Sequence, residues 1–193
     1  MKYIIFSGIS GFGNQLLGFK ELCILSKYLN RTIILPVFVP HGTIRNTTKP
    51  IYEFKEVFDV EYFKKFYDCI DFKDVSNITI DKAYCVRKGD ENELAMVYFN
   101  IKKHYYNIDN KIEFKNLKTN YFSNIYNTNQ LNELKSIDDE ILVLIGLFDN
   151  VKISNCYKNG CLKCDYNNIY KTDYEYVCKS LKFNSIINNL TDK

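Results

Sequence analysis

The sequence predicts an α/β fold built on a parallel β-sheet with helices on its faces, and three segments near the N-terminus support this. Lys2 to Ser7 is a β-branched and aromatic run that stops at a glycine, which is typical of a buried parallel strand. A helical pattern runs from Gly13 to Leu29, and Thr32 to Leu35 is a second apolar run, which Pro36 ends. Strand, helix and strand within about 35 residues make a βαβ unit, whose crossover should be right-handed.

The helical segment shows the pattern of a helix packed on a sheet. Four of its residues recur at steps of four, three and four and form one apolar stripe: Gly18, Leu22, Leu25 and Leu29. At Gly18 the missing side chain lets the helix approach the sheet. Lys20, Lys27 and Arg31 fall outside the stripe, and we expect them in solvent.

The remaining elements are less clearly marked. Three later apolar runs are expected to be strands or extended chain, at residues 83–87, 96–101 and 141–148. Three segments are expected to be helices, at residues 57–67, 170–181 and 185–190. Residues 37–56 are punctuated by proline and glycine and are expected to be a loop. Residues 74–81 and 105–134 carry no pattern that assigns them.

Composition and charge narrow the class of protein. The chain has 193 residues, of which 46% are hydrophobic and 25% charged, ordinary values for one soluble domain. Its net charge of +3 is too small to indicate nucleic acid or a membrane surface as a partner. No apolar run approaches the ~20 residues of a membrane span. The apolar N-terminus runs into a glycine loop without a cleavage site, so we expect a strand, no signal peptide and a cytoplasmic location.

The loop between the first strand and the helix is the strongest candidate site. It reads Gly8-Ile9-Ser10-Gly11-Phe12-Gly13-Asn14-Gln15. A helix that begins after such a loop presents unpaired backbone N–H groups and the positive end of its dipole, and glycine lets a ligand come close. A phosphate or diphosphate is the usual ligand. The alternative is a tight strand-to-helix turn that binds nothing.

The residues around the glycines separate three classes of nucleotide site. A P-loop needs Lys and Ser or Thr after its last glycine, where this chain has Asn14-Gln15-Leu16. A dinucleotide site needs a carboxylate at the end of the second strand, where this chain has Leu35-Pro36-Val37. A sugar-nucleotide site is the class that remains.

Several segments together resemble the N-terminal part of the GDP-fucose protein O-fucosyltransferases. The most specific are Gly11-Phe12-Gly13-Asn14-Gln15 and, after the helix, Leu29-Asn30-Arg31-Thr32 with Ile34-Leu35-Pro36. Weaker similarity continues at residues 50–54, 57–58 and 181–183. The resemblance implies a Rossmann-like parallel sheet flanked by helices, corresponding to the N-terminal half of a GT-B glycosyltransferase. Residues 1–193 are then a single domain, and the C-terminal donor-binding domain is absent.

The resemblance also implies site residues. Asn14 would direct its amide at the donor diphosphate or the reacting centre and act in catalysis, where it would stabilise the charge on the leaving group. Gly11, Phe12, Gly13 and Gln15 would bind substrate as part of the pocket wall. The family often has Arg where this chain has Gly11, so one charge-assisted contact to phosphate is missing.

Two functions of different classes follow. The first is an inverting fucosyltransferase, truncated or split, that uses GDP-fucose as donor and a protein or glycan hydroxyl as acceptor. It would need no metal, because the chain contains no Asp-x-Asp motif. The second is a non-catalytic fragment or pseudoenzyme that binds sugar nucleotide weakly or only with a second polypeptide; self-association is a further expectation. A different Rossmann-type nucleotide binder is a more distant alternative.

Three other groups of residues have both a functional and an ordinary structural interpretation. His41 follows the second strand on the side where α/β sites form, and is predicted to contact substrate; a surface loop histidine is the alternative. Cys156, Cys161, Cys164 and Cys178 have spacings that fit reduced loop cysteines better than a zinc site. The acidic run at residues 138–140 is interpreted as a turn ahead of a buried strand rather than as a general base.

Overall fold

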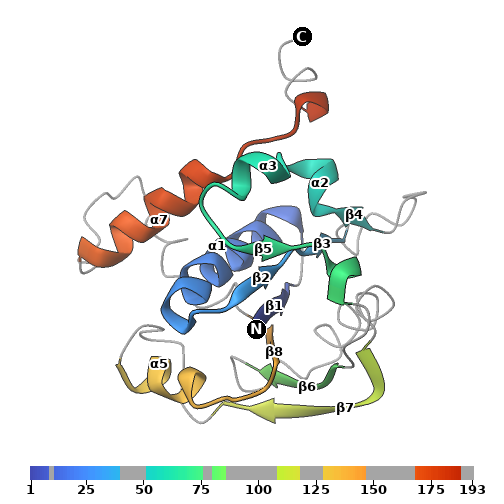
Figure 1. Cartoon of the computed structure of the whole chain (residues 1–193), viewed down its shortest axis with the longest axis vertical. Helices are drawn as coiled ribbons and strands as arrows, with labels where there is room; N and C mark the ends of the chain where they lie inside the picture. Colours follow the sequence, from blue (N-terminus) through green and yellow to red (C-terminus); the bar gives the residue numbers. More distant parts are fainter. Residues whose placement is uncertain are drawn as a thin grey trace.

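A six-stranded parallel sheet forms the centre of the structure (Figure 1). The computed structural model describes residues 1–8, 11–39, 51–75, 80–85, 108–117, 128–146 and 168–187. Within these residues the strand order is β5-β2-β1-β8-β6-β7, and every pair is parallel. The strands are β1 (Tyr3–Ser7), β2 (Thr32–Ile34), β5 (Cys69–Ile70), β6 (Ile80–Cys85), β7 (Ile108–Asn116) and β8 (Ile141–Ile145). The predicted α/β class with a parallel sheet is confirmed.

The predicted βαβ unit is present almost residue for residue. Helix α1 (Phe12–Leu29) connects β1 to β2, which pair in parallel with Tyr3 opposite Thr32. The helix ends at Asn30, which adopts the left-handed conformation with φ 51°. Asparagine tolerates this conformation better than most residues, so the chain can turn directly from the helix into β2.

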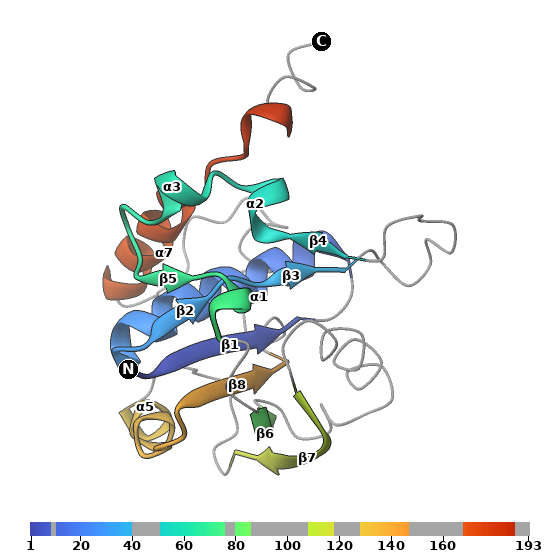
Figure 2. The same cartoon turned by 45° about the vertical axis from the view of Figure 1, so that its right-hand side comes forward.

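Side chains of the strands alternate between two cores, one on each face of the sheet. In β1, Ile4 and Phe6 belong to the core on the α1 side, and Ile5 belongs to the core on the other side. Helices α1, α5 (Thr128–Lys135) and α7 (Asn168–Ser180) cover the first face, and the short 3₁₀ helix η1 (Phe72–Val75) lies on the second (Figures 1 and 2). Strands buried on both faces are apolar throughout, which explains the unbroken apolar runs in the sequence.

Burial of α1 extends well beyond the predicted stripe. Gly18, Leu22 and Leu25 are buried as expected, and Leu29 is partly buried against the same core. Phe19, Glu21, Cys23, Ile24 and Ser26 are also buried, because α1 lies between the sheet and helix α7. The stripe therefore marks the face toward the sheet but understates how much of the helix is enclosed.

The region after β2 differs from the prediction. Residues 37–56 contain β3 (Val37–Phe38), which pairs antiparallel with β4 (Tyr52–Glu53), and the start of α2 (Phe54–Val57). The single helix expected over residues 57–67 is replaced by the end of α2 and by α3 (Val60–Phe63). The break lies at Phe58, which is extended and forms an antiparallel bridge with Phe183. That partner lies 125 residues away in the sequence, so no local pattern could reveal the break.

The later elements agree in kind with the predictions. Strand β6 begins before residue 83, β8 covers the first part of residues 141–148, and α7 confirms the helix of residues 170–181. Residues 185–187 are helical. The unassigned stretch 105–134 contains β7 and the start of α5. The strand expected at residues 96–101 lies outside the described residues. No helix in the described part of the chain could span a membrane.

Arg31 is buried, contrary to the prediction that it is solvated. Its Nη1 donates to the carbonyls of Tyr3 at 3.1 Å and Asp139 at 2.8 Å, and its Nη2 donates to the Ile137 carbonyl at 2.6 Å. The side chain thus joins the start of β1 to the turn before β8. The acidic turn has a structural role as well, because the Asp139 carboxylate accepts the Tyr84 hydroxyl proton at 2.5 Å and pairs with Lys82 at 3.3 Å.

We expect Arg31→Ala to lower the free energy of unfolding by about 3 kcal/mol, because three backbone carbonyls lose a charged donor. Arg31→Lys should recover only part of this, since an ammonium cannot reproduce the planar fork of donors. Urea unfolding measures both. Lys135→Ala, at an exposed position ending α5, is the control and should change stability by less than about 0.5 kcal/mol. An Arg31→Ala variant as stable as this control would show that the three contacts contribute nothing.

Glu21 is expected to make the stability of the fold depend on pH. It is buried in α1, and neither carboxylate oxygen has a hydrogen-bond partner among the described residues, so desolvation raises the pKa of its carboxyl well above the ordinary value. Because the pKa is raised in the folded state, the contribution of Glu21 to the free energy of unfolding is complete below its unfolded-state pKa of about 4.3. This contribution is lost as the pH rises through the folded-state pKa. Relative to wild type, Glu21→Gln should therefore gain stability with rising pH. Chemical unfolding of both proteins at pH 5 and pH 8 tests this. An equal difference in the free energy of unfolding between variant and wild type at the two pH values would contradict it.

Candidate functional site

The glycine loop lies where the central strands end. Strand β1 stops at Ser7, which stands opposite Ile145 at the end of β8, and the loop leads from there into α1. Figure 2 shows the arrows of β1 and β8 pointing to the same edge of the sheet. Ligands of open α/β sheets bind outside this carboxyl edge, so the predicted site is at the position that the fold favours.

The N-terminus of α1 is open to an anionic ligand. Gly11 is the residue before the helix, with extended backbone (φ −66°, ψ 166°), and its carbonyl accepts from the N–H of Asn14 at 3.0 Å and of Gln15 at 3.2 Å. No side chain of the described residues caps this end, and the first turn contains no acidic residue. The positive end of the helix dipole is therefore not neutralised by the turn itself.

Two glycines of the loop have opposite surroundings. A Cβ added at Gly13 would meet no atom of the described residues within 4 Å, so the backbone there faces away from them. A Cβ added at Gly8 would lie 2.7 Å from the Phe6 ring and 3.2 Å from the Gln15 Cα, which is closer than packing allows. Gly8 is therefore required by the protein's own packing, whereas Gly13 leaves room for a molecule that approaches the helix.

The neighbours Asn14 and Gln15 have different surroundings. Asn14 is half-buried, and its side chain makes no hydrogen bond to the described part of the chain. The Gln15 side chain is 0% exposed; its Nε2 donates to the Val39 carbonyl at 2.6 Å, and its Oε1 accepts the Val39 N–H at 3.0 Å. The ligand contact predicted for Gln15 stays a prediction, and the structure shows its amide bonded inside the protein.

Phe12 begins a row of aromatic side chains that leads away from the loop. Its ring meets Phe38 edge-on at 5.2 Å between centroids and stacks on Phe58 at 6.4 Å. Phe58 in turn stacks on Phe183 at 5.3 Å. We call Phe12, Phe58 and Phe183 the aromatic row. Its two ends are partly in solvent, with Phe12 38% and Phe183 42% exposed, and Ile186 beyond them is 71% exposed.

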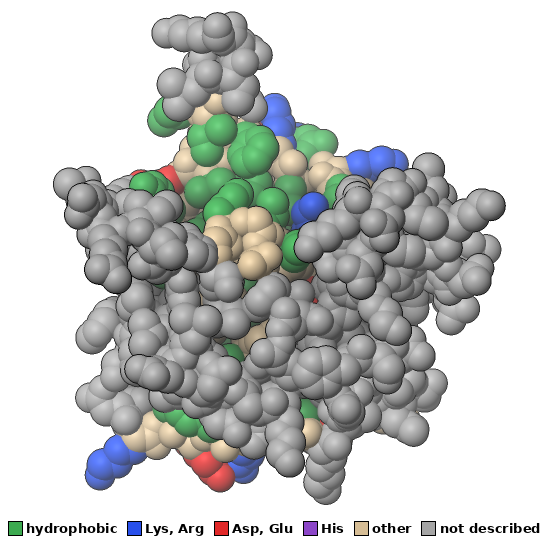
Figure 3. All heavy atoms as spheres, turned by 180° about the vertical axis from the view of Figure 1, so that it is seen from behind, with side chains coloured by type: hydrophobic (Ala, Val, Ile, Leu, Met, Phe, Trp, Pro, Cys, Tyr) green, Lys and Arg blue, Asp and Glu red, His purple; other side chains and the backbone are tan. Residues whose placement is uncertain are grey.

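Hydrophobic side chains gather on the face shown in Figure 3, close to the C-terminal segment. The described part of this segment, residues 182–187, extends away from the body of the molecule in Figures 1 and 2. An exposed apolar patch of this kind is typical of a surface that another polypeptide covers.

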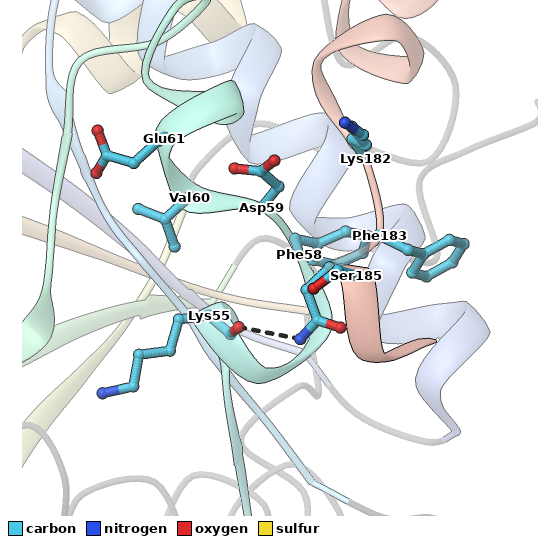
Figure 4. Close-up of a pocket in the computed structure, with 9 residues that line it drawn as sticks. Lys55, Phe58, Asp59, Val60, Glu61, Lys182, Phe183 and Ser185 are labelled. Carbon is cyan, nitrogen blue, oxygen red and sulfur yellow. Dashed lines mark hydrogen bonds between the residues drawn. The ribbon is translucent and has the colours of Figure 1, made fainter. Parts of the chain in front are cut away.

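A shallow pocket of about 300 Å³ adjoins the aromatic row, between the α2–α3 junction and the segment 182–185 (Figure 4). Phe58 and Phe183 form part of its wall. Its charged groups already have partners: Lys55 pairs with Glu53 at 2.7 Å, Glu61 pairs with Lys64 at 2.9 Å, and Asp59 accepts the Tyr62 N–H at 2.9 Å. Sequence reasoning did not single out this pocket, because its two walls come from distant segments.

Ser7 is a polar residue that sequence reasoning passed over. It is buried at the end of β1, next to Gly8, and its hydroxyl has no hydrogen-bond partner among the described residues. A buried hydroxyl without a partner is unfavourable, so a polar partner for it is expected at this edge of the sheet. The available signal was a single hydroxyl at the end of an otherwise apolar strand.

Two predicted groups cannot be placed. His41, Cys156, Cys161 and Cys164 lie outside the described residues, so their roles stay predictions. Cys178 is a half-buried free thiol in α7. Within the described ranges, no group of three or more His, Cys, Asp or Glu side chains could hold a metal ion.

Solved structures of POFUT1 share the fold. The structure in complex with GDP-fucose has a TM-score of 0.62 and 15% identity, and the match covers 99% of this chain and 54% of that one. The structure in complex with GDP has a TM-score of 0.62 and 17% identity, with 99% and 53% covered. This chain therefore spans about half the length of the solved chains. No curated protein sequence matches it.

The sequence itself matches a family over nearly its whole length. The model of the GDP-fucose protein O-fucosyltransferases fits residues 3–193. The match includes the glycine loop, α1, the aromatic row and the C-terminal segment. The resemblance seen in the loop-helix-strand motif is thereby confirmed, and the chain belongs to the GDP-fucose protein O-fucosyltransferase family.

Proposed function

We propose that this chain is the N-terminal half of a fucosyltransferase that uses GDP-fucose and transfers fucose to a hydroxyl of a protein or glycan. The observation that carries the proposal is the open first turn of α1, with Gly13 facing free space, in a chain that its family's model covers from residue 3 to 193. In this proposal residues 1–193 form one Rossmann-like domain, and the other half of the enzyme binds most of the donor.

The chemistry suited to this turn is stabilisation of a leaving diphosphate. The acceptor oxygen bonds to C1 of fucose from one side while the bond from C1 to the diphosphate oxygen breaks on the other, which inverts C1, and the hydroxyl proton is released. Negative charge grows on the diphosphate during this step. The dipole of α1 and the side-chain amide of Asn14 are the groups of this chain that would stabilise it.

Metal independence is part of the proposal. Its support is the lack of an Asp-x-Asp motif in the sequence, together with the helix N-terminus, which can supply positive potential without a cation. We also propose a cytoplasmic location. Its support is that the first apolar run forms strand β1 of the sheet.

The proposal requires a partner for the exposed end of the aromatic row. The solved POFUT1 chains are nearly twice as long as the part matched here, with 54% covered. A second polypeptide that supplies the other half, or a second copy of this chain, would cover Phe12, Phe183 and Ile186. The alternative function, a non-catalytic chain that binds a partner or binds sugar nucleotide weakly, is favoured by Gly11, which stands where the family often has a cation.

Gly13→Ala should weaken binding of GDP and GDP-fucose about tenfold or more without destabilising the fold. The added methyl meets no protein atom, and alanine is a better helix former than glycine, so stability should be unchanged or higher by up to about 1 kcal/mol. Asn14→Ala should weaken binding by about tenfold or more through loss of a hydrogen bond to a charged group. Calorimetric titration in EDTA measures both affinities.

Gly8→Ala serves as the contrasting variant, because its methyl would clash with Phe6 and Gln15 and should lower stability instead. Wild-type chain that binds neither GDP nor GDP-fucose would leave the alternative function in place. Equal affinity of the wild-type and Gly13→Ala chains would show that the ligand does not approach the first turn.

Ile186→Ser should reduce association through the apolar surface next to the C-terminal segment. Ile186 is 71% exposed, so its loss should leave the fold as stable as before. Light scattering across a concentration series should show wild-type chain forming larger species and the variant remaining monomeric. Tyr52→Ser, on β4, is the control for removal of another exposed hydrophobic group. Monomeric wild-type chain at every concentration would eliminate self-association and leave a separate polypeptide as the proposed partner.

A further inference from the structure

The side-chain amide of Gln15 makes the two backbone hydrogen bonds to Val39 that a neighbouring strand would otherwise make. Val39 follows directly after β3, and both its N–H and its carbonyl bond to Gln15, at 3.0 Å and 2.6 Å. A primary amide presents one donor and one acceptor side by side, as a backbone peptide group does. The pair of bonds is buried, with Gln15 0% and Val39 2% exposed, so water cannot substitute for either partner.

A third segment meets the same side chain. The Gln15 Cα and Cγ lie so close to Gly8 that a Cβ there would be 3.2 Å and 3.3 Å from them. The end of β1, the first turn of α1 and the end of β3 therefore converge on one residue. We call Gly8, Gln15 and Val39 the Gln15 joint. Neither Gly8 nor Val39 has an ionisable side chain, and the Phe6 ring that closes this space has none either.

The joint determines which way the first turn of α1 faces. Successive residues of an α-helix are about 100° apart around its axis. With Gln15 held in the core, Asn14 and Gly13 are turned away from Val39, which agrees with the open space at Gly13 and the half-buried Asn14. The orientation of the proposed donor contacts thus depends on a residue that lies behind them.

We infer that Gln15 is a positioning residue of the proposed donor site, which holds the first turn of α1 in the orientation that directs Asn14 and the Gly13 backbone at the diphosphate. The inference rests on the proposed function. It also differs from the contact predicted from the sequence, because Gln15 acts through Asn14 and Gly13 and its own amide stays bonded to Val39.

Gln15→Glu tests the inference through pH. An ionised carboxylate accepts the Val39 N–H but cannot donate to the Val39 carbonyl. One of its oxygens then faces the carbonyl oxygen of Val39, and their repulsion breaks the Gln15 joint. The protonated carboxyl has both a donor and an acceptor and restores it. The ratio of variant to wild-type affinity for GDP-fucose should fall about tenfold or more at pH 8 and return toward one at pH 5. Gln15→Met, similar in size and without either bond, should lose affinity at both pH values.

Two further readouts separate positioning from general loss of stability. Exchange of the Val39 amide hydrogen should quicken in Gln15→Glu at pH 8, relative to wild type, and return to the wild-type rate at pH 5. Arg31→Lys destabilises the fold from the far end of α1, so it should keep the wild-type affinity. Affinities are compared only at temperatures where each variant is folded by near-UV circular dichroism.

The outcomes are distinguishable. The inference is supported if Gln15→Glu loses both GDP-fucose affinity and protection of the Val39 amide from exchange at pH 8. Both should recover at pH 5. Wild-type affinity in Gln15→Glu while Val39 exchanges freely overturns it and leaves the proposed function intact, as does an equal loss of affinity in Arg31→Lys. Wild-type chain that binds no GDP-fucose shows that this chain has no donor site of its own, which overturns the positioning role and favours the non-catalytic alternative.

Discussion

Helix α1 is held at both ends by side chains that bond to the backbone of other segments, and the rest of the structure depends on this. At its start Gln15 bonds to both polar groups of Val39, and just past its end Arg31 donates to the carbonyls of Tyr3, Ile137 and Asp139. Between these anchors the helix is enclosed by the sheet and α7. A helix fixed at both ends and packed between layers cannot rotate about its axis without breaking buried hydrogen bonds. The direction of its first turn is therefore a property of the whole fold.

The position of β1 explains why the loop begins with glycine. The strand lies between β2 and β8, with Ile4 and Phe6 in one core and Ile5 in the other. Its carboxyl end leads directly into a helix packed on the same sheet, so the chain must reverse within a few residues. Gly8 meets this constraint by allowing Gln15 and the Phe6 ring to come close. The same close approach leaves the first turn of α1 facing the edge where ligands of such sheets bind.

The charge of the donor diphosphate explains why the proposed function needs contacts from outside this chain. The N-terminus of a helix carries about half an elementary charge, which balances only part of the charge of a diphosphate. Gly11 stands where the family often has a cation, so this chain has less positive charge to offer. The proposed partner would then supply the remaining contacts to the donor. The aromatic row links the two sites, because Phe12 belongs to the glycine loop and Phe183 to the surface that the partner would cover.

The sequence by itself determined the βαβ unit, the parallel sheet, the helix at 170–181 and the family, because these follow from local periodicity and from a contiguous motif. The tertiary structure alone decided what single side chains do. The loop pattern marks Asn14 and Gln15 alike, yet only packing leaves Asn14 half-buried and bonds Gln15 to Val39. Arg31 lies off the apolar stripe and was expected in solvent, but it is buried, and two of its three acceptors come from residues more than a hundred positions away. Phe58 interrupts a helical pattern to pair with Phe183 for the same reason. Local patterns report the interactions of neighbours in sequence, whereas these residues are defined by hydrogen bonds and ring contacts that exist only once distant segments have come together.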